Sequence, residues 1–173
     1  MFKGLSAFPL TPIRNGVVDE AAFIRIIRML ASSGIDSIGA LGSTGSYAYL
    51  DAATRARVAE LAVENANEIP VIVGVGAVST SEVLKNVRGA EEAGAAGLLL
   101  APMTYQPLTE DEVFGLFRTV TDSTELPVVL YDNPGTTHFS FTTELYARIA
   151  ALPRIASIKI PGFPVSDSQM QVR

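Results

Sequence analysis

The sequence predicts an α/β protein built on a parallel sheet, and three observations support that prediction. Strand-like and helix-like segments alternate about every 30 residues along the chain, which is the pattern of repeated βα units. Most strand candidates are continuous runs of Val, Ile and Leu, typical of parallel strands that are buried on both faces. Hydrophobic residues form 48% of the 173 residues and the mean hydropathy is +0.31, as a sheet covered on both faces requires.

Six strands and five helices are expected, and most of the helices have recognisable ends. The strands are expected at residues 4–10, 37–41, 70–75, 97–102, 127–131 and 154–160. The first four helices are expected to begin at side chains that cap helix N-termini, namely Asp19, Asp51, Ser79 and Thr109. Glu82 and Glu112 follow the last two at the spacing of a capping box. The fifth helix is expected at about residues 141–152.

Two architectures fit this alternation. An open, doubly wound sheet suits six strands, whereas a (β/α)₈ barrel would lack two of its units. Polar residues at the carboxyl ends of the strands favour the barrel, because in a parallel barrel those ends form the active-site face. We therefore expect a TIM-type barrel with six of its eight strands present, forming one domain over residues 1–173 that is truncated after the sixth strand. Residues 162–173 have no helical periodicity and are expected to form an irregular tail.

Composition excludes several functional classes. No run approaches the roughly 18 apolar residues of a membrane helix, and residues 1–4 lack the features of a signal peptide. The chain has no cysteine and only one histidine, His138, so thiolate sites and sites with several histidines are impossible. A net charge of −5 without a basic cluster argues against nucleic acid and anionic membranes. We expect a soluble, cytoplasmic protein.

A lysine near the end of the last strand is the strongest candidate for chemistry. Alternation in residues 154–160 predicts that Ile155, Ser157 and Lys159 share one face. Burying an ammonium in so apolar a strand is costly, and a lysine present in part as the free amine is a nucleophile toward carbonyl carbons. The alternative is a lysine that extends to solvent at a strand end.

A glycine-rich turn follows the second strand. In Gly42-Ser43-Thr44-Gly45-Ser46, two glycines allow a sharp turn that exposes backbone N–H groups beside two hydroxyls, an arrangement suited to a carboxylate or a phosphate. No Gly-Lys-Ser/Thr follows, so the stretch is not a P-loop. An ordinary loop is the alternative.

Two tyrosines also lie at carboxyl ends. Tyr131 ends the fifth strand, on the face of Val129, and could exchange a proton in a dry pocket or simply pack its ring. Tyr105 lies in the loop after the fourth strand, where it is either a second phenol of the site or a side chain that anchors the loop. His138 is interpreted as a structural hydrogen-bond partner.

These stretches together resemble a known family. Gly42-Ser43-Thr44-Gly45, Tyr131-Asp132-Asn133-Pro134, the strand with Ile158-Lys159 and the opening Phe8-Pro9-Leu10-Thr11-Pro12 are similar to motifs of the dihydrodipicolinate synthase/N-acetylneuraminate lyase family of pyruvate-dependent class I aldolases. The motifs occur in the family's order, from about residue 3 to Ile160. The resemblance implies reversible formation or cleavage of a C–C bond without a metal or an organic cofactor.

The resemblance also implies roles for individual residues. Lys159 would form a Schiff base with pyruvate, and Tyr131 would shuttle protons in a relay with Ser43 and Tyr105. Ser43, Thr44 and Gly45 would hold the pyruvate carboxylate. The implied partners are pyruvate or another keto acid, an aldehyde or sugar-acid substrate, and further copies of the chain in a homo-oligomer.

Two positions depart from the family's pattern. Ser46 replaces a usual glutamate, and Thr136 stands where the synthases carry an arginine for the carboxylate of aspartate semialdehyde. The resemblance therefore implies an aldolase with a different acceptor, such as one that acts on 2-keto-3-deoxy sugar acids. One alternative is a non-catalytic relative or fragment that binds a keto acid or a partner protein. Another is an open-sheet signalling or nucleotide-binding domain, but the first strand lacks the acidic cluster or phosphate loop that such a domain needs.

Overall fold

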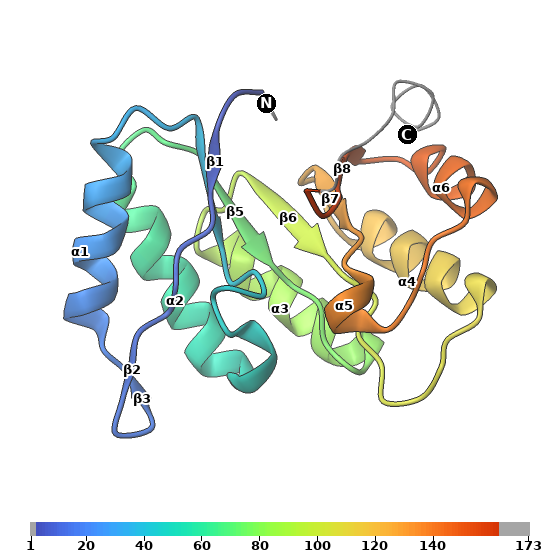
Figure 1. The fold of residues 1–173 in the computed structure, drawn as a ribbon, viewed down its shortest axis with the longest axis horizontal. Coiled ribbons are helices and arrows are strands. Elements are labelled where there is room, and N and C mark those ends of the chain that lie inside the picture. The colour runs from blue at the N-terminus through green and yellow to red at the C-terminus, as the bar shows by residue number, and fades with distance from the viewer. Residues whose placement is uncertain (1–2, 163–173) are drawn as a thin grey trace.

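Six parallel strands form one curved sheet in the computed structural model, which describes residues 3–162 (Figure 1). The sheet order is β1-β4-β5-β6-β7-β8, so each strand of the sheet pairs with the next one along the chain. The bounds are Ser6–Ala7 (β1), Ser37–Ala40 (β4), Val71–Gly74 (β5), Gly97–Leu100 (β6), Val128–Tyr131 (β7) and Ile155–Lys159 (β8). The six predicted parallel neighbours are confirmed. The open-sheet alternative is wrong, because β1 lies at an edge of the sheet.

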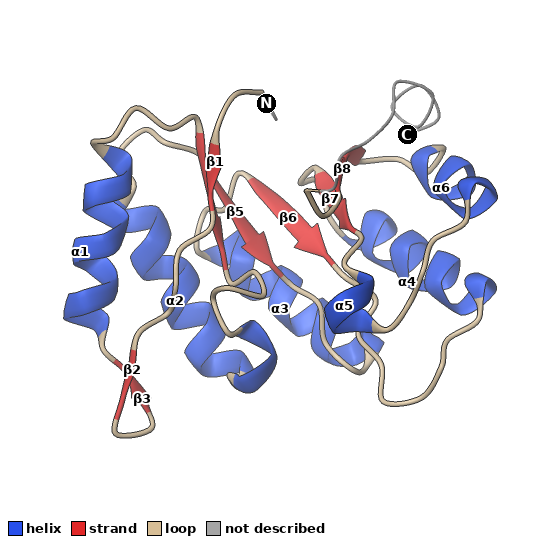
Figure 2. Ribbon diagram, viewed as in Figure 1, coloured by secondary structure: helices blue, strands red, loops and turns tan. Residues whose placement is uncertain are grey.

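Helices cover the outside of this sheet (Figure 2). They are α1 (Glu20–Ala31), α2 (Ala52–Asn65), α3 (Thr80–Glu92), α4 (Glu110–Ser123) and α6 (Thr143–Ala150). All four predicted N-caps accept a hydrogen bond from a backbone amide of the first turn, and Thr109 with Glu112 forms a complete capping box. None of the helices in residues 3–162 has the length and apolar character needed to cross a membrane.

The two faces of the sheet bury different clusters. The outer face packs against the helices, and the cluster between them contains the largest fully buried side chains, among them Phe23 of α1 and Phe117 of α4. The inner face carries a small cluster formed by Ile72, Leu99, Ala101, Val129 and Tyr131, with Phe8 packed against it. A Cβ atom on Gly39 would lie 2.2 Å from the Phe8 ring, so this ring packs directly on the β4 backbone inside the curve of the sheet.

Four short elements were not predicted. The strands β2 (Ile13–Arg14) and β3 (Val17–Val18) form an antiparallel hairpin that projects from the sheet below α1 in Figure 1. Its turn is Asn15-Gly16, and both residues have positive φ angles, 52° and 81°. Asn-Gly is a strong hairpin signal, so the sequence did contain this information. The short helices η1 (Tyr47–Tyr49) and α5 (Pro134–Thr137) lie in loops after β4 and β7.

The expectation that Ile155 shares a face with Ser157 and Lys159 is wrong. The pairing of β7 with β8 shifts register between Val128 and Val129, so that Ile155 pairs with Val128 but Ser157 pairs with Val129. Such a bulge adds one residue to a strand and reverses the alternation on either side of it. Ile155 therefore packs against the outer core, whereas Ser157 and Lys159 line a cavity with Phe8, Leu99 and Val129 of the inner face. The expected tail, residues 162–173, lies outside the described residues except for Gly162.

Candidate functional site

The sheet brings three of the predicted site residues together at its carboxyl end. Tyr131 pairs with Lys159 in the register of β7 and β8, and the amide of Asp132 donates to the Lys159 carbonyl at 2.9 Å. The Tyr131 hydroxyl lies 3.2 Å from Ser43 Oγ, although 88 residues separate the two in sequence. The lysine, the phenol and the glycine-rich turn therefore form one cluster, as the barrel interpretation required.

Lys159 lies between two aromatic rings. Its Nζ is 4.1 Å from the ring centroid of Tyr131 and 4.8 Å from that of Phe8. The cavity of about 210 Å³ beside it has apolar walls from Ile72, Leu99 and Val129. Within residues 3–162 the amine forms no ion pair with a carboxylate. The amine is positioned to meet a carbonyl carbon in an apolar setting.

The Tyr131 hydroxyl makes two hydrogen bonds, one of which was not predicted. The side-chain amide of Asn133 donates to Tyr131 Oη at 2.8 Å, and Ser43 Oγ makes the second contact. Asn133 follows Tyr131 by two residues, a spacing at which strand residues share a face. The two-residue spacing could have indicated that Asn133 lies near Tyr131. It does not show that the Asn133 side chain turns back toward the phenol.

The Gly42–Gly45 turn is shaped by close backbone packing. Leu41 has a positive φ of 56°, and its carbonyl would lie 1.9 Å from a Cβ atom at position 74. Gly74 therefore lets the turn pass directly over the end of β5. In the described part of the chain, the amides of Ser43, Thr44 and Gly45 donate no hydrogen bond, which leaves three donors for an anionic group.

One predicted site residue lies apart from this cluster. Tyr105 is 90% exposed, and its hydroxyl contacts neither Ser43 nor Tyr131 in this chain. Thr44 belongs to the Gly42–Gly45 turn, but it is exposed. The structure thus joins Ser43 with Tyr131, but leaves the third member of the predicted relay in a surface loop.

Tyr47 and Arg55 form a buried pair beside the turn that sequence reasoning missed. Tyr47 lines a cavity of about 140 Å³ together with Ser43, Met103 and Thr136, and burial raises its pKa to about 12. The Arg55 guanidinium lies 5.3 Å from the Tyr47 ring centroid and donates to the carbonyls of residues 74 and 76 at 2.8 and 2.9 Å. Burial lowers the pKa of Arg55 to about 10, so it stays charged at neutral pH and supports the end of β5.

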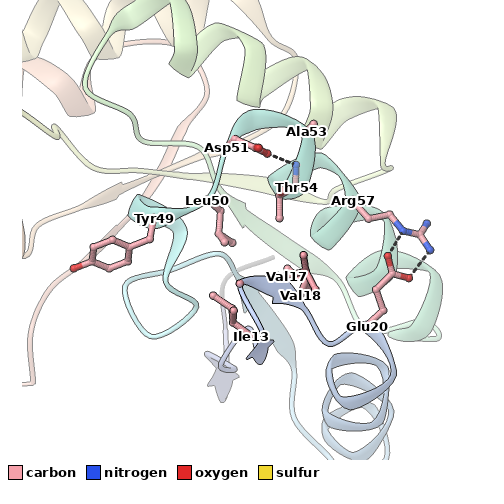
Figure 3. Close-up of a pocket in the computed structure, with 11 residues that line it drawn as sticks. Ile13, Val17, Val18, Glu20, Tyr49, Leu50, Asp51, Ala53, Thr54 and Arg57 are labelled. Atoms are coloured by element: carbon pink, nitrogen blue, oxygen red, sulfur yellow. Dashed lines mark hydrogen bonds and ion pairs between the residues drawn. The ribbon is translucent and has the colours of Figure 1, made fainter.

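A hollow of about 550 Å³ lies away from this cluster, between the β2–β3 hairpin and the start of α2 (Figure 3). Several of its polar groups are already paired. Arg57 forms an ion pair with Glu20 at 2.9 Å, and Asp51 Oδ1 accepts from the Thr54 amide at 2.7 Å. We therefore place the chemistry at two smaller cavities, one lined by Lys159 and the other by Ser43, because the Tyr131 side chain contacts both of these residues.

A metal centre is not evident in the described part of the chain. Residues 3–162 contain no group of three or more His, Cys, Asp or Glu side chains that could hold a metal ion. The candidate site presents an amine, hydroxyls and amides instead.

The chain is similar to proteins of one family. A family model described as the dihydrodipicolinate synthetase family matches residues 1–163. The 4-hydroxy-tetrahydrodipicolinate synthase of Hyphomonas neptunium is 38% identical over 160 residues, and that of Pelobacter propionicus is 35% identical over the same length. Each alignment covers 92% of this chain but 55% of the relative, so the chain spans about half the length of the curated relatives it matches.

Solved structures agree with this similarity. A dihydrodipicolinate synthase from Agrobacterium tumefaciens is 44% identical with a TM-score of 0.92, covering 96% of this chain and 57% of that one. The synthase of Acinetobacter baumannii, crystallised with pyruvate, is 30% identical with a TM-score of 0.86 and covers 92% and 55%. A prophage protein of Escherichia coli, also in complex with pyruvate, is 30% identical with a TM-score of 0.83 and covers 92% and 54%.

Proposed function

Because this chain belongs to the dihydrodipicolinate synthetase family, we propose that the protein is a pyruvate-dependent class I aldolase or lyase whose Schiff-base residue is Lys159. The observation that carries the proposal is the position of the Lys159 amine, 4.1 Å from the ring centroid of Tyr131, whose hydroxyl contacts Ser43. The pyruvate present in two of the similar solved structures supports a keto acid as the substrate.

The proposed chemistry begins with imine formation. The Lys159 amine attacks the carbonyl carbon of pyruvate, so that a C–N bond forms and the C=O π bond breaks. The two protons of the amine nitrogen are transferred to the carbonyl oxygen, which leaves as water. Tyr131 carries these protons, taking each from nitrogen and delivering it to oxygen. A proton then moves from the pyruvate methyl group to the imine nitrogen, and the resulting enamine attacks an acceptor aldehyde.

The remaining residues of the site have supporting roles in this proposal. The amides of Ser43, Thr44 and Gly45 hold the pyruvate carboxylate, and Ser43 Oγ exchanges protons with Tyr131. Tyr105 stays a proposed member of the relay. Because Tyr105 is 90% exposed, it would need a loop movement or a neighbouring copy of the chain to reach a serine hydroxyl.

We also infer that the protein works in the cytoplasm as a homo-oligomer. Two exposed tyrosines, Tyr49 at 88% and Tyr105 at 90%, support a contact surface, because tyrosines are enriched at interfaces. Light scattering during size-exclusion chromatography measures the assembly, and a monomer mass at micromolar concentration would contradict it.

The Schiff base can be tested by reductive trapping on the protein at its natural length. Incubation with pyruvate and borohydride should add one reduced pyruvate, which peptide mapping should locate on Lys159. Lys159→Ala should abolish the adduct. Lys85→Ala is the matched control, because Lys85 lies on α3 in an ion pair with Glu82 and should not affect labelling. Tyr131→Phe should slow the adduct's formation by about 100-fold.

Deuterium exchange provides a second readout that needs no acceptor. In heavy water the enamine step should replace the methyl protons of pyruvate, and nuclear magnetic resonance follows their loss. A folded protein that neither forms the adduct nor exchanges these protons would point to the non-catalytic alternative. An adduct on Lys3 or Lys85 would contradict the assignment of Lys159.

A further inference from the structure

Asn133 occupies the N-cap of α5 but does not cap it. Its side chain makes no hydrogen bond to the first turn of that helix. The five longer helices behave differently, because each accepts a backbone amide at its N-cap side chain, namely Asp19, Asp51, Ser79, Thr109 and Thr142. Asparagine is among the best N-cap residues, so the lost capping bond needs a reason. The side chain instead donates to Tyr131 Oη at 2.8 Å.

The backbone around Asn133 is firmly held. Its carbonyl accepts from the amides of Thr136 and Thr137, both at 3.0 Å, and from Thr137 Oγ1 at 3.1 Å. On the other side, Asp132 donates its amide to the Lys159 carbonyl and accepts the Tyr146 hydroxyl at its buried carboxylate. The side-chain amide is therefore presented to the phenol from a fixed backbone, which is the preorganised arrangement that proton transfer benefits from.

The chemistry of the amide decides where the phenol proton lies. An NH₂ group can only donate, so the phenol oxygen accepts this bond and keeps its own O–H for another partner. Ser43 Oγ, 3.2 Å away, and the substrate oxygen proposed above are the groups on that side. When Tyr131 gives up its proton, the N–H···O bond becomes charge-assisted and roughly twice as strong. The amide therefore favours both the direction of transfer and the phenolate that follows it.

We propose that Asn133 is a positioning residue for proton transfer by Tyr131, directing the phenol proton toward Ser43 and substrate and stabilising the phenolate. This inference rests on the proposed aldolase function and adds to it a residue that acts through the phenol. Sequence reasoning assigned no role to Asn133, whose residue type and position predict a helix cap.

Two substitutions test whether Asn133 acts by donating a hydrogen bond to Tyr131 or only by filling space beside it. Asn133→Leu keeps a similar volume and removes the donor, so methyl exchange of pyruvate should slow by about 10-fold. Asn133→Asp is isosteric but replaces the donor with an acceptor, which draws the phenol proton away from Ser43 and repels the phenolate. The loss should then reach about 100-fold. Asn67→Asp is the matched control, since Asn67 is exposed and distant from the site, and it should keep the full rate.

The measurement is methyl exchange in heavy water, with trapping at Lys159 as the check on the proposed function. The half-saturating pyruvate concentration should stay unchanged in both variants, because the Gly42–Gly45 turn is intact. In a Tyr131→Phe background neither substitution should lower the residual rate by more than about twofold, because the group through which Asn133 acts is gone. A merely structural role would cause the same loss in both backgrounds.

Three results separate the possibilities. Slow exchange with unchanged half-saturation, dependent on Tyr131, supports the role of Asn133. Normal rates in both variants of an active protein overturn it and leave the aldolase proposal intact, as does an equal loss in the Tyr131→Phe background. A wild-type protein that fails both exchange and trapping overturns the two proposals together.

Discussion

Removing the hydroxyl of Tyr146 tests how the carboxyl end of β7 is held beside Lys159. This hydroxyl donates to Asp132 Oδ2, and Asp132 is only 7% exposed. The Tyr146 ring stacks on Phe141 with the centroids 5.2 Å apart, a contact that Tyr146→Phe preserves. The substitution therefore removes one hydrogen bond to a buried carboxylate and leaves the packing of the rings in place.

The expected cost follows from the partners of that carboxylate. Among the described residues, the other oxygen, Asp132 Oδ1, has no hydrogen-bond partner, so loss of the Tyr146 hydroxyl leaves the buried group poorly compensated. Hydrogen bonds to charged groups contribute about 1.5–3 kcal/mol. We therefore expect Tyr146→Phe to lower the free energy of unfolding by about 2 kcal/mol, which corresponds to a fall in Tm of about 4–8 °C.

Urea denaturation followed by circular dichroism measures this loss, which should appear as a lower midpoint with an unchanged m value. Asp132→Asn in the Tyr146→Phe background should recover at least half of the loss, because a neutral amide needs less compensation than a carboxylate. Tyr49→Phe is the matched control, since this tyrosine is 88% exposed and should leave the midpoint unchanged. A loss below about 0.5 kcal/mol, or strictly additive effects of the two substitutions, would refute the reasoning.

Two further predictions concern Tyr47 and Thr136. Burial raises the pKa of Tyr47 to about 12, above the usual value near 10 of an unfolded chain, so the neutral phenol contributes stability below pH 10 that is lost as pH rises through 12. Absorbance of tyrosinate should show a component near pH 12 that Tyr47→Phe lacks, and its persistence in that variant would contradict the assignment. The natural-length protein should also condense pyruvate with aspartate semialdehyde poorly, because Thr136 beside the Ser43 cavity cannot grip a carboxylate as an arginine does. Steady-state assay of that reaction tests this, and efficient turnover would show that another group binds the aldehyde.

The sequence by itself determined the order of the strands and the ends of the helices. Alternation of apolar runs with capped helices predicted six parallel strands, and Asp19, Asp51, Ser79 and Thr109 cap their helices as expected. The strands and caps depend on residues within a few positions of one another, so the local sequence is enough to predict them. Their sequential order was predicted from the polar residues at the carboxyl ends of the strands, which only a barrel brings together. The β2–β3 hairpin belongs to the same class, because its Asn15-Gly16 turn was visible in the sequence.

Only the tertiary structure decided where individual side chains of the site point. A bulge turned Ile155 to the outer face, Tyr105 lies on the surface, and Asn133 binds the Tyr131 phenol rather than its own helix. Each outcome is a competition between partners that lie close in space but not in sequence. An asparagine can accept a backbone N–H at a cap through Oδ1 or donate to a phenol through Nδ2, with hydrogen bonds of similar strength, and packing of β7 against β8 decides which partner is within reach.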